Sequence, residues 1–159
     1  MNACCVCRLG MPASEGVVLT VLTYLKNGKF DDAIARFAEE FRFKDHAMGV
    51  ELKDRERLRE FFQKTWKFYP DSFWQTDTIF ACGDHVITEW TLHASWTETS
   101  YGGFSRKDRI SLHNTSIVRT DHGKIIDWSD YYDGLTSRRT ALASYFMESV
   151  DSIIRGFHP

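Results

Sequence analysis

The chain has 159 residues, of which 43% are hydrophobic and 14% aromatic, so it fits one domain with a substantial core. A formal net charge of −2 offers no basic excess for nucleic acid or an anionic membrane, and no run approaches the roughly 18 apolar residues that span a bilayer. We therefore expect a cytoplasmic protein whose aromatic residues pack a core or line a ligand cavity.

The four cysteines suit neither a metal site nor a disulfide framework. Three of them crowd the first seven residues, and Cys82 stands alone. No matching Cys or His pair follows at the spacing of a zinc site. Cysteines that are adjacent in sequence cannot cross-link distant parts of a fold by pairing with each other. We expect residues 1–12 to form a disordered tail with reduced cysteines, followed by one domain over residues 13–159.

Three segments with helical periodicity come first. Ser14 is a good N-cap for a helix that ends at Gly28, and its apolar residues recur at helical spacing. A second, short helix is expected over residues 30–38. Asp54 caps a third helix, which carries an apolar stripe and ends at Pro70.

From residue 72 onward the apolar period changes from 3.6 to 2, which indicates strands. The expected strands cover residues 40–46, 72–82, 84–97, 108–119 and 124–132. Gly83-Asp84 and His122-Gly123 supply turns, and a closing helix is expected over residues 136–154. Helices followed by an antiparallel meander are typical of an α+β fold whose helices cover one sheet face.

Strand alternation places three polar side chains on inward, otherwise apolar rows. Asp130 shares a face with Trp128 and Tyr132, Asp45 continues the apolar row of the first strand, and Asn114 lies in the middle of the strand over 108–119. Buried carboxyls are costly unless paired or shifted in pKa, and such placements concentrate in functional pockets. A structural role stays open, because both aspartates lie near strand ends, where Asp often caps a turn.

The histidines carry a weaker signal. His46 follows Asp45 at a strand end, where it could lie at the rim of a pocket, whereas His93 and His113 fall on the outer sheet face. Trp and Phe residues are more typical of a core than of a ligand platform.

Several stretches, between about residues 15 and 135, resemble the NTF2-like superfamily. The resemblance rests on Leu25-Lys-Asn-Gly-Lys-Phe-Asp-Asp-Ala-Ile, Phe43-Lys-Asp-His with a later Gly49, Val86-Ile-Thr-Glu-Trp-Thr, and Gly123-Lys-Ile-Ile-Asp-Trp-Ser-Asp-Tyr-Tyr-Asp. The most similar members are SnoaL-like polyketide cyclases, ketosteroid isomerases and limonene-epoxide hydrolases. The resemblance implies a cone-shaped, cystatin-like half-barrel: a curved mixed β-sheet wrapped around three N-terminal helices, with an internal pocket and a C-terminal helix. It also implies a homodimer that pairs through the outer sheet face.

The resemblance implies roles for individual residues. Asp45 falls where ketosteroid isomerases keep their general-base aspartate, and Asn114 falls close to the protonated acid that donates to the oxyanion. The isomerase phenol falls at Val21, one turn before Tyr24, which is its possible substitute. Asp130 resembles the acid/base aspartate of the cyclases.

Epoxide hydrolysis is disfavoured by the same comparison. Asp130 matches one aspartate of the hydrolases' Asp-Arg-Asp arrangement, but the Arg falls at Trp90 and the other Asp at Leu92.

We therefore expect a small-molecule acid/base enzyme of isomerase, cyclase or lyase type, acting without metal or cofactor on an apolar, ring-containing, carbonyl-like substrate. Asp45 or Asp130 would move the proton, and Asn114 would stabilise the oxyanion. The expected substrate-binding residues are Tyr24, His46, Phe62, Trp66, Trp90, Leu92, Trp128 and Tyr132. The alternative is a non-catalytic module that holds a ligand or partner, because fold does not imply function.

Overall fold

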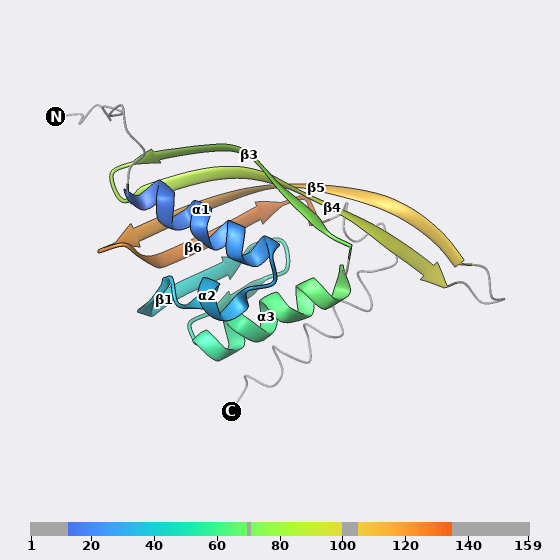
Figure 1. Cartoon of the computed structure of the whole chain (residues 1–159), viewed down its shortest axis with the longest axis horizontal. Helices are drawn as coiled ribbons and strands as arrows, with labels where there is room; N and C mark the ends of the chain where they lie inside the picture. The colour runs from blue at the N-terminus through green and yellow to red at the C-terminus, as the bar shows by residue number, and fades with distance from the viewer. Residues whose placement is uncertain (1–12, 70, 100–104, 135–159) are drawn as a thin grey trace.

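Helices precede long strands in the computed structural model, which describes residues 13–69, 71–99 and 105–134 (Figure 1). Its helices are α1 (Ala13–Lys26), α2 (Phe30–Ile34) and α3 (Arg55–Phe68). Its strands are β1 (Phe37–Asp45), β2 (Val50–Leu52), β3 (Phe73–Cys82), β4 (His85–Thr99), β5 (Ser105–Asp121) and β6 (Lys124–Tyr132). None of the described helices is both long and apolar enough to span a membrane.

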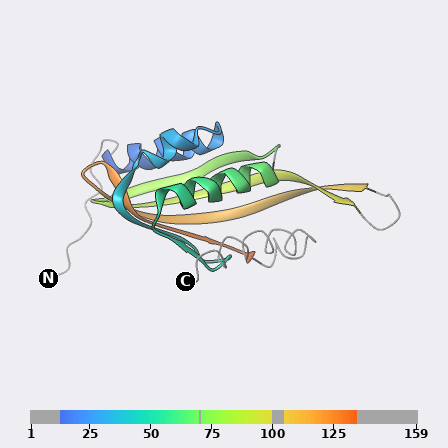
Figure 2. The same cartoon turned by 90° about the horizontal axis from the view of Figure 1, so that it is seen from below.

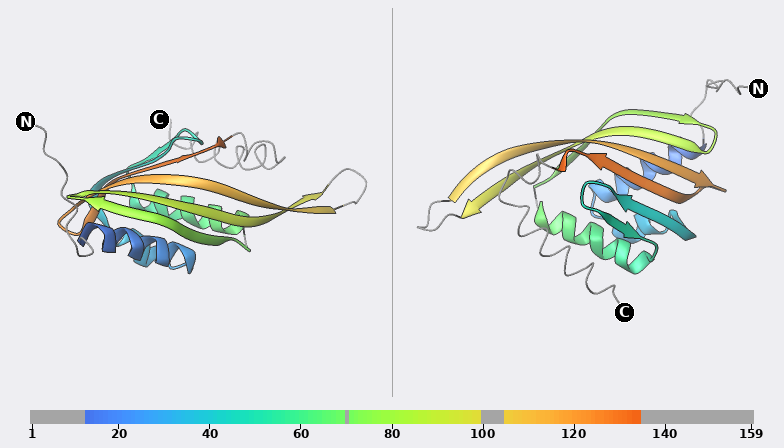
Figure 3. Two further views of the ribbon diagram at one scale, coloured as in Figure 1. Left: turned by 90° about the horizontal axis from the view of Figure 1, so that it is seen from above. Right: turned by 180° about the vertical axis from the view of Figure 1, so that it is seen from behind.

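The strands form one six-stranded sheet in the order β2-β1-β6-β5-β4-β3. β1 pairs with β6 in parallel, and the other neighbouring pairs are antiparallel. The sheet curves around the helices, which lie on one side of it, and the β4–β5 hairpin extends beyond them (Figures 2 and 3). The predicted α+β cone with a mixed, unclosed sheet is therefore confirmed.

Tertiary packing corrects one predicted boundary and adds one strand. The second helix ends at Ile34 rather than near residue 38, because Phe37 already belongs to β1, where it is fully buried and pairs with Ile125 of β6. The short strand β2 was not predicted, since its three residues are too few to show alternation.

The two predicted N-caps have different outcomes. Asp54 caps α3 as expected, because its carboxylate accepts the backbone N–H of Arg57 at 2.9 Å. Ser14 lies inside α1 instead, and its hydroxyl donates to the carbonyl of Gly83 at 3.1 Å. Ser14 therefore ties α1 to the β3–β4 turn rather than satisfying the start of its own helix.

The predicted turn between β5 and β6 has the backbone conformation of a tight hairpin. His122 and Gly123 both have positive φ, at 45° and 74°, as both central residues of a two-residue type I′ turn must. The β3–β4 turn also falls at the predicted Gly83-Asp84 pair.

Cys82, the last residue of β3, is disulfide-bonded. This contradicts the expectation that no cysteine of the chain takes part in a disulfide. The predicted tail over 1–12 and the closing helix over 136–154 lie outside the described residues.

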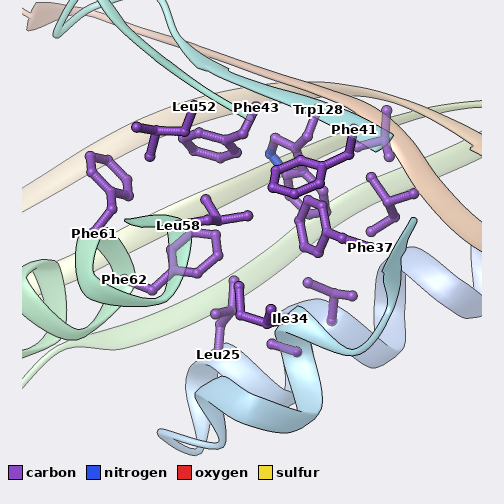
Figure 4. Packing of buried hydrophobic residues seen from close by; sticks show 14 of the residues in the cluster. Leu25, Ile34, Phe37, Phe41, Phe43, Leu52, Leu58, Phe61, Phe62 and Trp128 are labelled. Atoms are coloured by element: carbon purple, nitrogen blue, oxygen red, sulfur yellow. The ribbon is translucent and has the colours of Figure 1, made fainter. Parts of the chain in front are cut away.

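The main core lies between the three helices and the sheet (Figure 4), and α3 packs on the β1 side of it. Phe43 of β1 is fully buried, and its ring centroid lies 5.4 Å from that of Phe61 and 5.6 Å from that of Phe62. Leu58 completes the same face of α3. The apolar stripe predicted on the third helix is thus the surface that holds α3 on the sheet.

Replacing Phe43 with alanine tests this packing. Phe43→Ala should lower the free energy of unfolding by about 3–5 kcal/mol, since it leaves a cavity beneath two aromatic rings. Urea denaturation measures the change, and Lys64→Ala on the exposed side of α3 is the control, expected within about 0.5 kcal/mol of the wild type. A loss below about 1 kcal/mol for Phe43→Ala would contradict the described core.

Candidate functional site

Parallel pairing of β1 with β6 sets Asp45 directly beside Asp130. Both are buried, with 5% and 8% of their surfaces exposed. Their inward orientation, predicted from strand alternation, is confirmed. Two neighbouring buried carboxyls form the centre of the candidate site.

The two oxygens of Asp130 have different surroundings. Oδ1 accepts hydrogen bonds from the Ser116 hydroxyl at 2.5 Å and from Trp128 Nε1 at 2.6 Å. The Ser116 oxygen in turn accepts from Trp90 Nε1 at 2.8 Å. No described residue donates to Oδ2. One oxygen is therefore held in place, while the other keeps its lone pairs for an incoming group.

Burial raises the pKa of Asp130 to about 7, because desolvation disfavours the carboxylate. The hydrogen bonds from Ser116 and Trp128 oppose this shift, and the nearby Asp45 carboxyl adds to it. A carboxyl with a pKa near neutrality exchanges a proton readily in either direction at physiological pH.

Asp45 has partners on both oxygens. Oδ1 accepts the backbone N–H of Met48 at 2.8 Å, and Oδ2 accepts the Tyr132 hydroxyl at 3.0 Å. Burial raises the pKa of Asp45, although these two hydrogen bonds oppose the shift. Burial and the neighbouring Asp45 also raise the pKa of Tyr132, so the phenol stays protonated. Asp45 therefore caps the turn after β1, one of the roles left open by the sequence.

Asn114 is buried in β5, opposite Trp90 on one side and Tyr132 on the other. Because Ser116 is the direct partner of Asp130, Asn114 is its diagonal neighbour, a relation that separates residues by about 7–8 Å. Its Nδ2 donates to the carbonyl of Leu112 at 2.8 Å, and no described residue accepts the second amide hydrogen. The amide can thus donate to a third group.

Three of the predicted substrate-binding residues are linked to the acids by hydrogen bonds, and a fourth, Leu92, packs with one of them. Trp128 donates a hydrogen bond to Asp130, and Tyr132 donates one to Asp45. Trp90 donates to Ser116, which in turn donates to Asp130. Leu92 lies beside Trp90 in a second apolar cluster, which also holds Tyr69, Ala94 and Leu112.

The other four predicted residues contact different parts of the fold. Phe62 packs on Phe43 in the core, and Trp66 meets Phe30 edge-on at 6.0 Å. The Arg36 guanidinium lies 5.9 Å from the ring of Tyr24. His46 stacks on Tyr131 at 4.3 Å, and its backbone N–H donates to the carbonyl of Asp130.

Ser116 is the member of the site that the sequence did not single out. Its inward parity on β5 was recognisable, but a serine on an inner row is common, and only the register with β6 places it against Asp130. Among the described residues, no group of three or more His, Cys, Asp or Glu side chains could together hold a metal ion.

A separate groove of about 310 Å³ lies between α1 and β3. Leu22, Thr23 and Lys26 line it from α1, and Phe73 and Trp74 line it from β3. Trp90 also lines this groove, and its ring stacks on that of Trp74 with a centroid distance of 5.0 Å. Trp90 is therefore shared between the groove and the Ser116–Asp130 link.

Comparisons with solved structures bear on the fold. A putative SnoaL-like polyketide cyclase from Jannaschia sp. CCS1 superposes with a TM-score of 0.71 at 15% identity, over 86% of this chain and 96% of that one. The putative hydroxylase AclR from Streptomyces galilaeus gives 0.64 at 17% identity, over 81% and 96%. A hypothetical protein from Catenulispora acidiphila DSM 44928, with a ketosteroid isomerase-like fold and in complex with trimethylamine, gives 0.63 at 18% identity, over 73% and 84%.

No curated protein matches the chain by sequence. The family model described as the SnoaL-like domain matches residues 18–128, well over half of the chain. Together with the curved mixed sheet and its three covering helices, this match shows that the protein belongs to the SnoaL-like family of the NTF2-like superfamily.

Proposed function

We propose that the protein is an acid/base enzyme that moves a proton on a small, apolar, ring-containing substrate with a carbonyl-like group. Asp130 is the proposed proton-transfer residue. The observation that carries this proposal is a buried carboxyl with one oxygen held by Ser116 and Trp128 and the other unbonded among the described residues. A pKa of about 7 for Asp130 supports it.

In the proposed reaction, Oδ2 of ionised Asp130 takes a proton from the carbon next to the substrate carbonyl. The C–H bonding pair forms the enolate double bond, and the carbonyl π pair moves onto oxygen. The second amide hydrogen of Asn114 donates to that oxygen. Where the substrate also carries a C=C bond β,γ to the carbonyl, the intermediate is a dienolate. The protonated Asp130 then gives its proton to the γ-carbon, whose new C–H bond takes the β,γ π pair. The oxygen lone pair re-forms the carbonyl and the enolate double bond moves to the α,β position, which completes an isomerisation. General acid–base catalysis of this kind contributes roughly 10²–10⁴-fold.

Asp45 has a supporting role in this proposal. Both of its oxygens already accept hydrogen bonds, from Met48 and Tyr132, so it is less free than Asp130 to receive a substrate proton. A carboxyl beside Asp130 raises the pKa of Asp130, because two adjacent carboxyls resist being ionised together. Asp45 thus orients Tyr132 and helps to keep Asp130 near neutrality.

The structural neighbours support the fold on which this proposal depends. Their identities to this chain are 15–18%, so the activities in their names belong to those proteins. The choice among isomerase, cyclase and lyase chemistry rests on the site itself, where Asp130, with one carboxyl oxygen unbonded among the described residues, and the amide donor Asn114 lie on neighbouring strands.

The non-catalytic alternative has one observation in its favour. Asp45 serves as a turn cap through Met48, and hydrogen-bonded buried acids occur in structural networks as well as in active sites. The enzyme hypothesis requires Asp130 to act as a base. The non-catalytic hypothesis does not.

The Asp130→Asn variant distinguishes the catalytic from the non-catalytic hypothesis. Wild-type protein in D₂O should exchange the α-protons of apolar ring ketones such as 2-tetralone, followed by NMR. The rate should rise as pH passes through about 7, where Asp130 ionises. Asp130→Asn should lose at least about 10²-fold in rate without a lower melting temperature, since an amide oxygen can still accept from Ser116 and Trp128.

Asp127→Asn, at an outward position of the same strand, is the matched control and should exchange like the wild type. An Asp130→Asn protein that exchanges at the wild-type rate, or one that is clearly destabilised yet active, would rule out the catalytic assignment.

We also propose that the protein is a homodimer that pairs through the outer face of its sheet. Phe80, Ile87 and Ile117 are direct cross-strand partners on β3, β4 and β5. They are 53%, 38% and 41% exposed, whereas their chain neighbours Val86 and Val118 are buried. A contiguous exposed apolar row on the outer face of a sheet is typical of an interaction surface.

Light scattering tests the dimer. The wild type should give about twice the 18.5 kDa chain mass at micromolar concentration, and Ile87→Lys should shift it toward the monomer, because a charge would be buried in the interface. Lys64→Glu on the helical side should leave the mass unchanged. A wild-type mass near 18.5 kDa would count decisively against the dimer.

A further inference from the structure

The groove between α1 and β3 has the size and walls of a small-molecule site. Its volume of about 310 Å³ lies near the lower end of the roughly 300–1,000 Å³ that such sites occupy. Leu19 and Leu22 supply an aliphatic wall from α1, and Phe73, Trp74 and Trp90 supply an aromatic wall from the sheet. Such walls favour a flat, apolar ligand over a strongly hydrated one.

The aromatic wall presents a preformed flat surface. The rings of Trp74 and Trp90 are stacked, with 11° between their planes, and a planar ring can extend such a stack. Trp74 Nε1 is buried and has no hydrogen-bond partner in the described part of the chain. Buried donors without an acceptor are rare in native proteins, which makes Trp74 an unusual residue beside the groove.

The rim of the groove is positively charged. Lys26 lies at the end of α1, with its Nζ 4.4 Å from the centre of the Phe73 ring. Its ammonium group forms no salt bridge with any carboxylate among the described residues. An unpaired cation beside an aromatic wall favours a ligand that is both aromatic and anionic.

We propose that this groove binds a planar aromatic carboxylate, with its ring on the Trp74–Trp90 wall and its carboxylate at Lys26. The proposal does not rest on the acid/base function. The two sites meet at Trp90, whose ring lines the groove and whose Nε1 bonds to Ser116, the donor to Asp130. The groove is therefore a ligand site beside the acids, entered from the α1–β3 side of the fold.

The test is calorimetric binding of 2-naphthoate, with the neutral 2-naphthamide as its comparison. Wild-type protein should bind the carboxylate about tenfold more tightly than the amide, because a charged hydrogen bond to Lys26 adds to the shared ring contact. Lys26→Met should abolish that preference while keeping the amide affinity. Thr23→Trp, at an exposed position of α1 that lines the groove, should block both compounds.

Two controls separate this proposal from others. Lys53→Met removes an exposed lysine outside the groove and should bind both compounds like the wild type. Asp130→Asn should also bind normally, so that a failed acid/base function and a failed groove give different results. Circular dichroism melts verify that each variant folds. No measurable 2-naphthoate binding at millimolar concentration, or unchanged binding by both Lys26→Met and Thr23→Trp, would overturn the proposal.

Discussion

β1 and β6 pair in parallel, and this contact joins the first and the last strand of the described chain. The pairing sets Asp45 beside Asp130 and Phe43 beside Trp128. Phe43 in turn packs against Phe61 and Phe62 of α3. The same strand pair therefore contributes to the core and positions the two acids. Since side chains alternate between faces, a shift of one residue in this register would turn one carboxyl away from the other.

Two carboxyls in one buried environment become chemically different through their hydrogen bonds. Asp45 has both oxygens occupied and acts within the turn after β1. Asp130 has two donors on one oxygen, and burial outweighs their effect on its pKa. Environment rather than residue type therefore distinguishes Asp45 from Asp130, the proposed proton-transfer acid, as in other paired carboxylate sites.

The sequence was most informative where strands are long and regular. Alternation was sufficient to predict that Asp45, Asn114 and Asp130 face inward, because each lies in a strand of nine or more residues. The β2 strand escaped prediction and the end of the short α2 helix was placed too late, since tertiary pairing decides such short segments more than local pattern does. Ser14 shows the same effect, because a contact with Gly83 replaced its local capping preference.

Contacts between strands and between helices were less predictable. The Trp90–Ser116–Asp130 chain depends on the register of three strands, which alternation within one strand does not specify. The apolar stripe on α3 predicted which face of the helix points inward. It did not predict that this face packs partly on the sheet and partly on α2. Phe62 packs on the sheet, whereas Trp66 packs on Phe30 of α2.

The central claim is that Asp130 titrates near neutrality inside a folded, apolar site. Carboxyl ¹³C NMR of aspartate-labelled protein, with the Asp130→Asn variant used to assign the resonance, measures that pKa directly. We predict a titration midpoint at about 7. A midpoint near the ordinary value of 3.8 would contradict the account, because Asp130 would then be too weak a base for the proposed proton transfer.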